Sequence, residues 1–259
     1  MKKIIIYVAL IFCVKIAEAQ NVPFNEDVFN KWIDMRVGNG KSPAIWYCFG
    51  EVYSYPSGKL VARMEGIDQA NLIRATKDSA IQLNRKIFLY ENIDGSVMYE
   101  NNGQPVEHIE YPYQLIKYVL NGDKLKTWVT QGVGERMQTM GPGYNSTARK
   151  LGENYVFSSP VFLNFETPRG KYEAFENYDF FVNFSAKNTK DKYQLTWNRY
   201  GDLPPFIGGG KGVIQLVCYR VDKFDDLPQT LKKHILEKAP LWKAPPKDME
   251  EIKQMQGVK

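Results

Sequence analysis

Histidine is scarce in this sequence, and several motifs that mark common enzyme classes are missing. The 259-residue chain has only two histidines, His108 and His234, which excludes a histidine-rich metal site. There is no GxSxG nucleophile motif and no glycine-rich dinucleotide signature. The run Gly208–Gly210 before Lys211 lacks the spacing of a phosphate-binding loop and leads into a strand pattern. We therefore expect no metal and no cofactor.

Long apolar runs are also missing, with one exception at the N-terminus. Two lysines precede the apolar residues 4–14, and the sequence Ala17-Glu18-Ala19 matches a signal-peptidase site. The run is too short to span a bilayer. We expect residues 1–19 to be a cleaved signal peptide and residues 20–259 to form one exported β-rich domain, periplasmic or secreted, that is catalytic or binds a ligand.

A lipoprotein anchored through Cys13 is the alternative at this end of the chain. It is disfavoured because Phe12 is bulky for the position before a lipidated cysteine, and because Cys13 lies too early in the chain.

No block of lysines or arginines concentrates positive charge. Loss of residues 1–19 removes three lysines and one glutamate, which lowers the formal net charge from +5 to +3. A mildly basic chain without a basic block does not predict nucleic-acid binding, although it suits a small anionic ligand. About 240 mature residues fit a single domain.

Two cysteines remain after cleavage, Cys48 and Cys218. Both lie in apolar, strand-like runs, and neither has the CxxC spacing of a zinc or redox site. Export permits a disulfide. Because pairing needs a geometry that sequence does not show, two buried free thiols are the favoured prediction.

Short strand patterns dominate from residue 44 onward. Runs such as IWYCFGEVYSY and KLVARMEGI flank the turn PSG, and further short runs are separated by turn residues such as Asp94-Gly95 and Asn101-Asn102-Gly103. No helix-length apolar period interrupts them, so a parallel α/β fold is disfavoured. The pattern predicts a single antiparallel β-barrel, or a strongly curved sheet or sandwich.

Helices are expected at the two ends of this strand region. Residues 25–37 have apolar positions at helical spacing behind Asn25 as an N-cap. Residues 227–238 have a second such pattern, and a short polar helix should follow Pro245 and Pro246.

The stretch FETPRGKYEAFENYDFF, residues 165–181, mixes rings and charges on both faces of a strand. Alternation places Tyr172, Glu176, Tyr178 and two apolar residues on one face, and Lys171, Asn177 and three other residues on the opposite face. A barrel lumen or groove tolerates such a mixture. The plainer alternative is a salt-bridged edge strand over a small aromatic cluster.

A second dense stretch, TWNRYGDLPPF, begins at Thr196. Trp197 and Arg199 share a strand face, and a ring beside a guanidinium suits a sugar that carries a carboxylate or sulfate. An Arg199–Asp202 ion pair that only holds the turn is the structural alternative.

The remaining candidates come from separate segments. In HIEYPYQ, the Pro112 step bends the chain beside Tyr113, and His108 is the one histidine of the strand region. Arg136 follows a glycine-rich turn, and Arg169 opens the dense stretch. We predict Arg199 as a carboxylate-binding group, a tyrosine among Tyr113, Tyr172 and Tyr178 as the proton-transfer group, and His108 as an alternative base. Substrate contacts are expected from Trp197, Arg169, Lys171, Asn177 and Arg136.

Three blocks carry a family resemblance: PVFLNFETPRGKYEAFENYDFF, WNRYGDLPPF and APLWKAPP. Together they resemble a bacterial exported family classified as domain of unknown function 1838, over nearly the whole mature chain. Chains of this type also resemble an exported dehydratase that acts on oligosaccharides of the algal polysaccharide ulvan. The resemblance implies an acidic oligosaccharide substrate, but it assigns no site residue.

Removal of water from a terminal uronic acid needs three groups. One group neutralises the carboxylate, a base takes the C5 proton, and an acid protonates the departing 4-hydroxyl. Arginine, asparagine, tyrosine and histidine supply these roles without a redox cofactor. A non-catalytic barrel that binds a small anionic or carbohydrate ligand is the main alternative. A glycosidase is disfavoured, because Glu173, Glu176 and Asp179 lie too close along one strand to flank a sugar.

Overall fold

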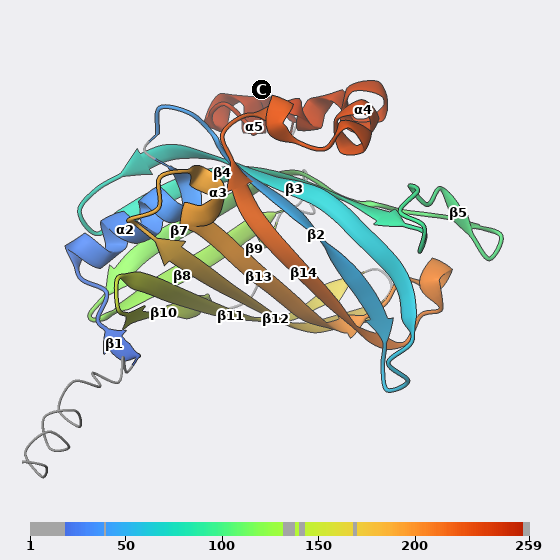
Figure 1. Cartoon of the computed structure of the whole chain (residues 1–259), viewed down its shortest axis with the longest axis horizontal. Coiled ribbons are helices and arrows are strands. Elements are labelled where there is room, and N and C mark those ends of the chain that lie inside the picture. Colours follow the sequence, from blue (N-terminus) through green and yellow to red (C-terminus); the bar gives the residue numbers. More distant parts are fainter. Residues whose placement is uncertain (1–18, 39, 132–137, 140–142, 168–169, 256–259) are drawn as a thin grey trace, which may run out of the picture.

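The strands pair in an order that closes on itself. In the computed structural model, the main sheet runs β1-β10-β11-β12-β13-β14-β2-β3-β4-β7-β8-β9, and β8 also pairs with β10. This last pairing closes ten antiparallel strands into a barrel (Figure 1). The structure describes residues 19–38, 40–131, 138–139, 143–167 and 170–255. The predicted signal peptide lies outside the described residues, apart from Ala19.

The strands of the barrel are long, and short strands extend from it. The barrel strands are β2 (Ala44–Ser54), β3 (Leu60–Ala75), β4 (Ser79–Glu91), β7 (Ile109–Asn121), β8 (Lys124–Gln131), β10 (Tyr144–Leu151), β11 (Asn154–Thr167), β12 (Gly170–Asn183), β13 (Tyr193–Asp202) and β14 (Lys211–Val221). The short strands are β1 (Gln20–Val22), β5 (Glu100–Asn101), β6 (Gln104–Pro105) and β9 (Gln138–Thr139). The predicted antiparallel barrel is confirmed.

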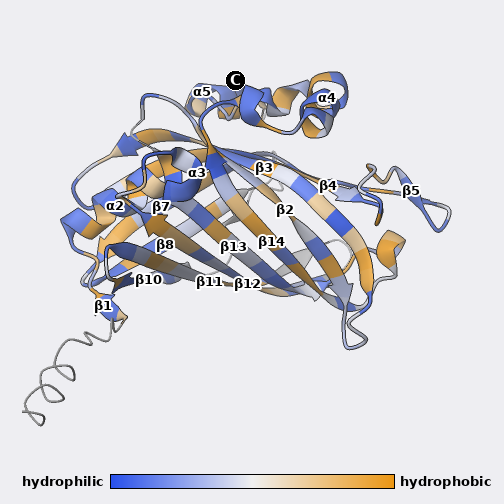
Figure 2. Cartoon of the chain, in the orientation of Figure 1, coloured by the Kyte–Doolittle hydropathy of each residue, from blue (hydrophilic) through white to orange (hydrophobic). Residues whose placement is uncertain are grey.

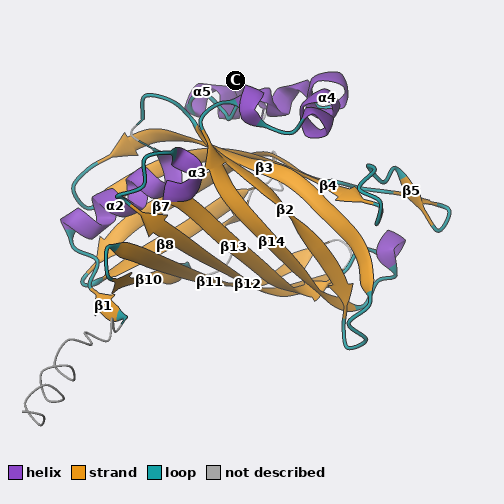
Figure 3. Cartoon of the chain, in the orientation of Figure 1, coloured by secondary structure: helices purple, strands orange, loops and turns teal. Residues whose placement is uncertain are grey.

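Helix α2 (Glu26–Val37) lies at one end of the barrel, where Asn25 caps it by accepting from the backbone N–H of Val28 at 2.9 Å (Figure 3). Its apolar face packs into the barrel interior. The Trp32 ring meets the edges of luminal rings at centroid distances of 5.3–5.8 Å, namely those of Phe180, Phe157 and Tyr118. The helix predicted at residues 25–37 is thus confirmed, and it fills one end of the lumen.

The remaining helical segments follow or interrupt the last strands. They are α3 (Thr189–Lys192), η2 (Pro205–Ile207), η3 (Phe224–Asp226), α4 (Gln229–Lys238), η4 (Pro240–Lys243) and α5 (Met249–Met255). α4, η4 and α5 lie outside the barrel against β3 and β4 (Figures 1 and 3). Ile67 and Ile87 pack outward against Leu231, Ile235 and Trp242. Strands β3 and β4 are therefore covered on both faces.

Polar and apolar residues alternate along most strands (Figure 2). The face of β2, β13 and β14 that carries Trp46, Leu195 and Leu216 belongs to the luminal core. On this face Cys48 lies directly opposite Cys218, with a Cα–Cα distance of 4.0 Å, and the two form a disulfide. The prediction of two free thiols was wrong. The sequence predicted correctly that each cysteine is buried. It did not show that they face each other, because that register joins two strands whose cysteines are 170 residues apart in the chain.

Candidate functional site

The interior faces of β12 and β13 bring the two dense sequence stretches together. Tyr178 lies opposite Trp197, and Glu176 lies opposite Arg199, in the antiparallel register. Because directly opposed residues point to the same side of a sheet, both pairs face the lumen. The rings of Tyr178 and Trp197 stack at 5.8 Å with an interplanar angle of 9°. The predicted shared face of Tyr172, Glu176 and Tyr178 is the interior face.

Arg199 is buried, with 8% of the residue exposed, and has three partners. Its Nε lies 3.6 Å from the Oε1 atom of Glu176. Its Nη2 donates to the hydroxyl of Tyr172 and to the backbone carbonyl of Asp202, the latter at 3.3 Å. The carboxylate of Asp202 pairs with Lys211 at 2.8 Å instead. The alternative of an Arg199–Asp202 ion pair is therefore wrong, although Arg199 does hold the turn through a carbonyl.

Small residues make room for this guanidinium. Gly201 lies opposite Ala174 on the same interior face. A Cβ atom at Gly201 would lie 2.8 Å from the Ala174 Cβ and 3.2 Å from the Arg199 Nη2. A side chain at position 201 would therefore crowd both Ala174 and Arg199.

A second charged group faces the same lumen, around Asp68 on β3. Arg36, from the last turn of α2, donates to its Oδ2 at 2.8 Å, and the side-chain amide of Asn84 donates to its Oδ1 at 2.6 Å. Lys86 on β4 lies 3.4 Å from Oδ2. Tyr118 extends this polar group by donating to Gln82 at 2.8 Å.

The two charged groups belong to one interior. The Lys86 ammonium lies 5.9 Å from the centroid of the Tyr178 ring. The pKa of Tyr144 is shifted by charges from both groups, by Glu176 of the first and by Arg36 and Asp68 of the second. Among the described residues, these charged groups comprise three cations and two carboxylates: Arg36, Lys86, Arg199, Asp68 and Glu176. Their formal sum is +1.

Solvent reaches this interior to a small extent. The exposed fraction is 13% for the side chain of Lys86, 12% for Glu176 and 10% for Asp68. The indole nitrogen of Trp197 is buried and has no hydrogen-bond partner within the described part of the chain. The lumen therefore offers a partly exposed cation, Lys86, and an unsatisfied donor, Trp197, both near the Tyr178 ring.

The luminal tyrosines stay protonated. Burial raises the pKa of Tyr90 and Tyr144, and it raises the pKa of Tyr118 to about 12. Burial together with the charge of Glu176 raises the pKa of Tyr178. For Tyr172, burial raises the pKa although Arg199 acts to lower it. The expectation that cations lower a tyrosine pKa enough to make it a base is therefore wrong; these hydroxyls are donors.

His108 and Tyr113 do not share the lumen with Arg199. The ring of His108 lies 5.8 Å from that of His234 on α4 and 6.3 Å from Tyr99. Its Nδ1 accepts from the backbone N–H of Tyr90 at 3.1 Å, so the neutral ring holds its proton on Nε2. Burial and the nearby His234 lower the His108 pKa to about 4. A ring that already accepts a backbone N–H is a poor base, and the grouping of His108 with Arg199 is corrected.

The other predicted contacts are also dispersed. Tyr113 is buried outside the barrel with Leu83 and Ile252 of α5. Lys171 points outward and pairs with Glu173 at 2.6 Å. Asn177 points outward and donates to Asp179 at 2.5 Å. Arg169 and Arg136 lie outside the described residues. Of the ten predicted site residues, the structure brings four together: Arg199, Trp197, Tyr172 and Tyr178.

Several luminal residues were missed as site candidates, namely Glu176, Lys86, Asp68 and Arg36. Alternation along β12 placed Glu176 on the face of Tyr172 and Tyr178, so that signal was present. Lys86 and Asp68 carried a weaker signal, a charge inside an apolar strand pattern. Arg36 occupied an apolar position of the helix at residues 25–37.

The family comparison covers the barrel and the segments that follow it. Residues 42–259 match the family model described as "Protein of unknown function (DUF1838)". The chain belongs to this family. No curated protein and no solved structure shows significant similarity to this DUF1838 chain. Within its described residues, no helix is long and apolar enough to cross a membrane. Also within those residues, no group of three or more histidine, cysteine, aspartate or glutamate side chains is arranged to hold a metal ion.

Proposed function

We propose that this DUF1838 protein is an exported hydro-lyase that removes water from a terminal uronic acid of an acidic oligosaccharide. The proposed substrates include fragments of ulvan, with or without sulfate groups, and the product is an unsaturated uronate. The observation that carries the proposal is a net positive interior containing a paired acid and carboxylate, Tyr178 and Glu176, at 2.6 Å.

The charge of the interior favours an acid as ligand. In the two charged groups around Asp68 and Glu176, three cations face two carboxylates, and an uncompensated charge in a poorly solvated interior is costly. A ligand carboxylate would neutralise it. The face of Trp197 is occupied by Tyr178, and its unsatisfied N–H is available to a sugar oxygen.

The paired groups supply the two proton transfers. In the proposed reaction, the Glu176 carboxylate accepts the C5 proton, and the C5–H electron pair becomes the C4=C5 double bond. The C4–O bond breaks as the Tyr178 hydroxyl gives its proton to the departing hydroxide, which leaves as water. The proton on Glu176 then returns to Tyr178 through their hydrogen bond, and the site is reset. Acid and base on one side of the sugar imply a syn elimination.

Arg199 organises this pair. It lies beside Glu176 and donates to Tyr172, so its charge stabilises the carboxylate that acts as base. The disulfide between Cys48 and Cys218 supports an oxidising, exported location. Localisation is tested by determining the N-terminus of the protein in the secreted or periplasmic fraction, which should lie near Gln20.

The test of function is incubation of the mature protein with saturated uronate-terminated oligosaccharides. The proposal requires growth of the ultraviolet absorbance of an unsaturated uronate and loss of one water from the mass. One alternative is a non-catalytic barrel that binds a small anionic or carbohydrate ligand, favoured by the raised pKa of the luminal tyrosines, which suits hydrogen bonding without proton transfer. Binding without a change in absorbance would support that alternative. Absence of both binding and absorbance change would contradict both functions.

A further inference from the structure

The positive charge in the lumen is not shared equally among its cations. Arg199 is matched by Glu176. Asp68 is held at short distance by Arg36 and Asn84, at 2.8 and 2.6 Å. Lys86 pairs with the same carboxylate at 3.4 Å, so Arg36 and Lys86 share a single negative charge. One positive charge around Asp68 is therefore uncompensated. Of the two cations, Lys86 has the longer contact and the more exposed side chain, 13% against 8% for Arg36.

Lys86 lies beside a bulge in the neighbouring strand β7. The register of β4 with β7 shifts between Asn84 and Lys86, where the paired residues Gln114 and Tyr111 of β7 are three positions apart instead of two. Such bulges re-aim side chains and are common beside active sites. Lys86 itself keeps regular register opposite Asp68 of β3, and its ammonium lies 5.9 Å from the centroid of the Tyr178 ring, beside the Tyr178–Glu176 pair.

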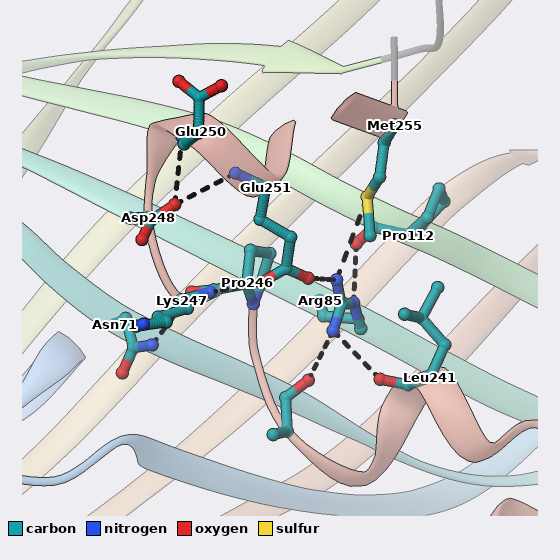
Figure 4. A network of polar contacts seen from close by, with 11 residues as sticks. Asn71, Arg85, Pro112, Leu241, Pro246, Lys247, Asp248, Glu250, Glu251 and Met255 are labelled. Carbon is teal, nitrogen blue, oxygen red and sulfur yellow. Dashed lines mark hydrogen bonds and ion pairs between the residues drawn. The ribbon is translucent and has the colours of Figure 1, made fainter. Parts of the chain in front are cut away.

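The backbone at this bulge is held from outside the barrel by the C-terminal segment. The indole N–H of Trp242 donates to the carbonyl of Lys86 at 2.6 Å, and Gln69 donates to the carbonyl of Trp242 at 2.5 Å. Arg85, the preceding residue, donates to the carbonyls of Leu241 and Ala244 at 2.9 and 2.8 Å (Figure 4). The block APLWKAPP thus contacts the outer side of the strand whose inner side carries Lys86.

We infer that Lys86 binds the carboxylate of the acidic ligand, and that Trp242 positions Lys86 through its backbone carbonyl. The inference rests on the proposed function for the class of ligand. It replaces Arg199 in the carboxylate-binding role, because the charge of Arg199 is already matched. It also gives the C-terminal block a role in the site, although Trp242 lies on the other side of the barrel wall.

The chemistry fits the reaction proposed above. A lysine ammonium has three donors and suits a carboxylate as a point charge. A uronate carboxylate at Lys86 brings its neighbouring C5 atom toward Glu176. The ammonium then stabilises the enolate-like charge that develops when C5 loses its proton. Lys86 is accordingly a binding residue, and Trp242 is a positioning residue.

The experiment measures binding without turnover. Calorimetry with the mature protein uses a 4-deoxy-uronate-terminated disaccharide, which has no 4-hydroxyl to lose, and its carboxyl-reduced neutral counterpart. Wild type should prefer the acidic form. Lys86→Gln, which keeps a donor for Asp68 but loses the charge, should weaken binding of the acidic form about 10- to 100-fold and leave the neutral form unchanged. Lys86→Arg should retain most of the preference.

Two further variants separate charge from position. Lys117→Gln removes the same charge from an exposed, outward position on the neighbouring strand β7 and should change neither affinity. Trp242→Phe keeps the ring but loses the N–H, and should lower the preference for the acidic form while neutral binding stays constant. Circular dichroism verifies that each variant is folded.

The outcomes distinguish the two proposals. If wild type prefers the acidic form and Lys86→Gln keeps that preference, the assignment of Lys86 is wrong while the proposed function stands. If wild type binds neither disaccharide, or binds both equally, the proposed function fails and the role of Lys86 fails with it. If Lys86→Gln does not fold, Trp242→Phe decides, and an unchanged preference there contradicts the inference.

Discussion

The hydroxyl of Tyr178 donates to the carboxylate of Glu176 at 2.6 Å inside the barrel. The two residues are two positions apart on β12, so strand alternation places them side by side on the luminal face. Burial and the adjacent Glu176 raise the pKa of Tyr178, which keeps its proton on the oxygen and available to a leaving group. This pair is the proposed acid and base.

Removal of either partner should therefore slow turnover strongly. We expect Tyr178→Phe and Glu176→Gln each to lower kcat about 10²- to 10⁴-fold, and the double variant to be little worse than either one, because the groups act as a unit. Tyr200→Phe on the outer face of β13 is the control, since that residue is 40% exposed. Full turnover by Tyr178→Phe would show that the acid is another group.

The position of His108 predicts a loss of stability in acid. Its folded pKa of about 4 lies below the usual 6.5, so the unfolded chain binds the proton more readily over that interval. The contribution of this residue is complete above pH about 6.5 and is lost as pH falls toward about 4. His108→Asn keeps an acceptor for the Tyr90 N–H and should reduce the slope of unfolding free energy against pH.

Urea unfolding of wild type and variant across that interval measures the difference. Glu91 produces an opposite slope, because burial and the nearby Glu65 raise its pKa to about 7. That contribution is present in both proteins and cancels when they are compared. Identical slopes would contradict the assignment of His108 as a buried neutral ring.

The Cys48–Cys218 disulfide should contribute strongly to stability. The bond joins residues 170 positions apart, and the loop-entropy model gives up to about 5 kcal/mol for a loop of that length. We expect reduction of the disulfide to lower the urea midpoint. The double variant Cys48→Ala/Cys218→Ala should lower the midpoint to the same extent as reduction does. A reductant that leaves the wild-type midpoint unchanged would contradict the disulfide.

Arg85 should anchor the C-terminal helices. It is 2% exposed, and it donates to three backbone carbonyls at 2.7–2.9 Å and to Glu251 at 2.7 Å (Figure 4). Arg85→Met leaves those carbonyls buried without a donor, and should cost about 3 kcal/mol of unfolding free energy. Limited proteolysis should then cut first after Ala239. Lys253→Met, on the exposed face of α5, should change the unfolding free energy by less than about 0.5 kcal/mol.

The strand pattern and the faces of individual strands were readable from the sequence. Alternation correctly grouped Tyr172, Glu176 and Tyr178, and separately grouped Trp197 with Arg199, because a strand's side chains alternate whatever the surrounding fold. The capped helix at residues 25–37 was equally local, since Asn25 and the apolar spacing suffice to define it. Those local rules determined the fold class and four members of the candidate site.

Tertiary structure alone decided which faces meet. Closure of the barrel through β8 and β10 made one face the interior, although both faces of β12 carry rings and charges. Strand register placed Cys48 opposite Cys218 and turned Lys86 toward Asp68 and Tyr178. His108 and Tyr113 lie on the outer wall of the barrel, where they contact His234 of α4 and Ile252 of α5. The physical reason is that register and helix docking depend on contacts between segments far apart in the chain, which the period of a single strand does not encode.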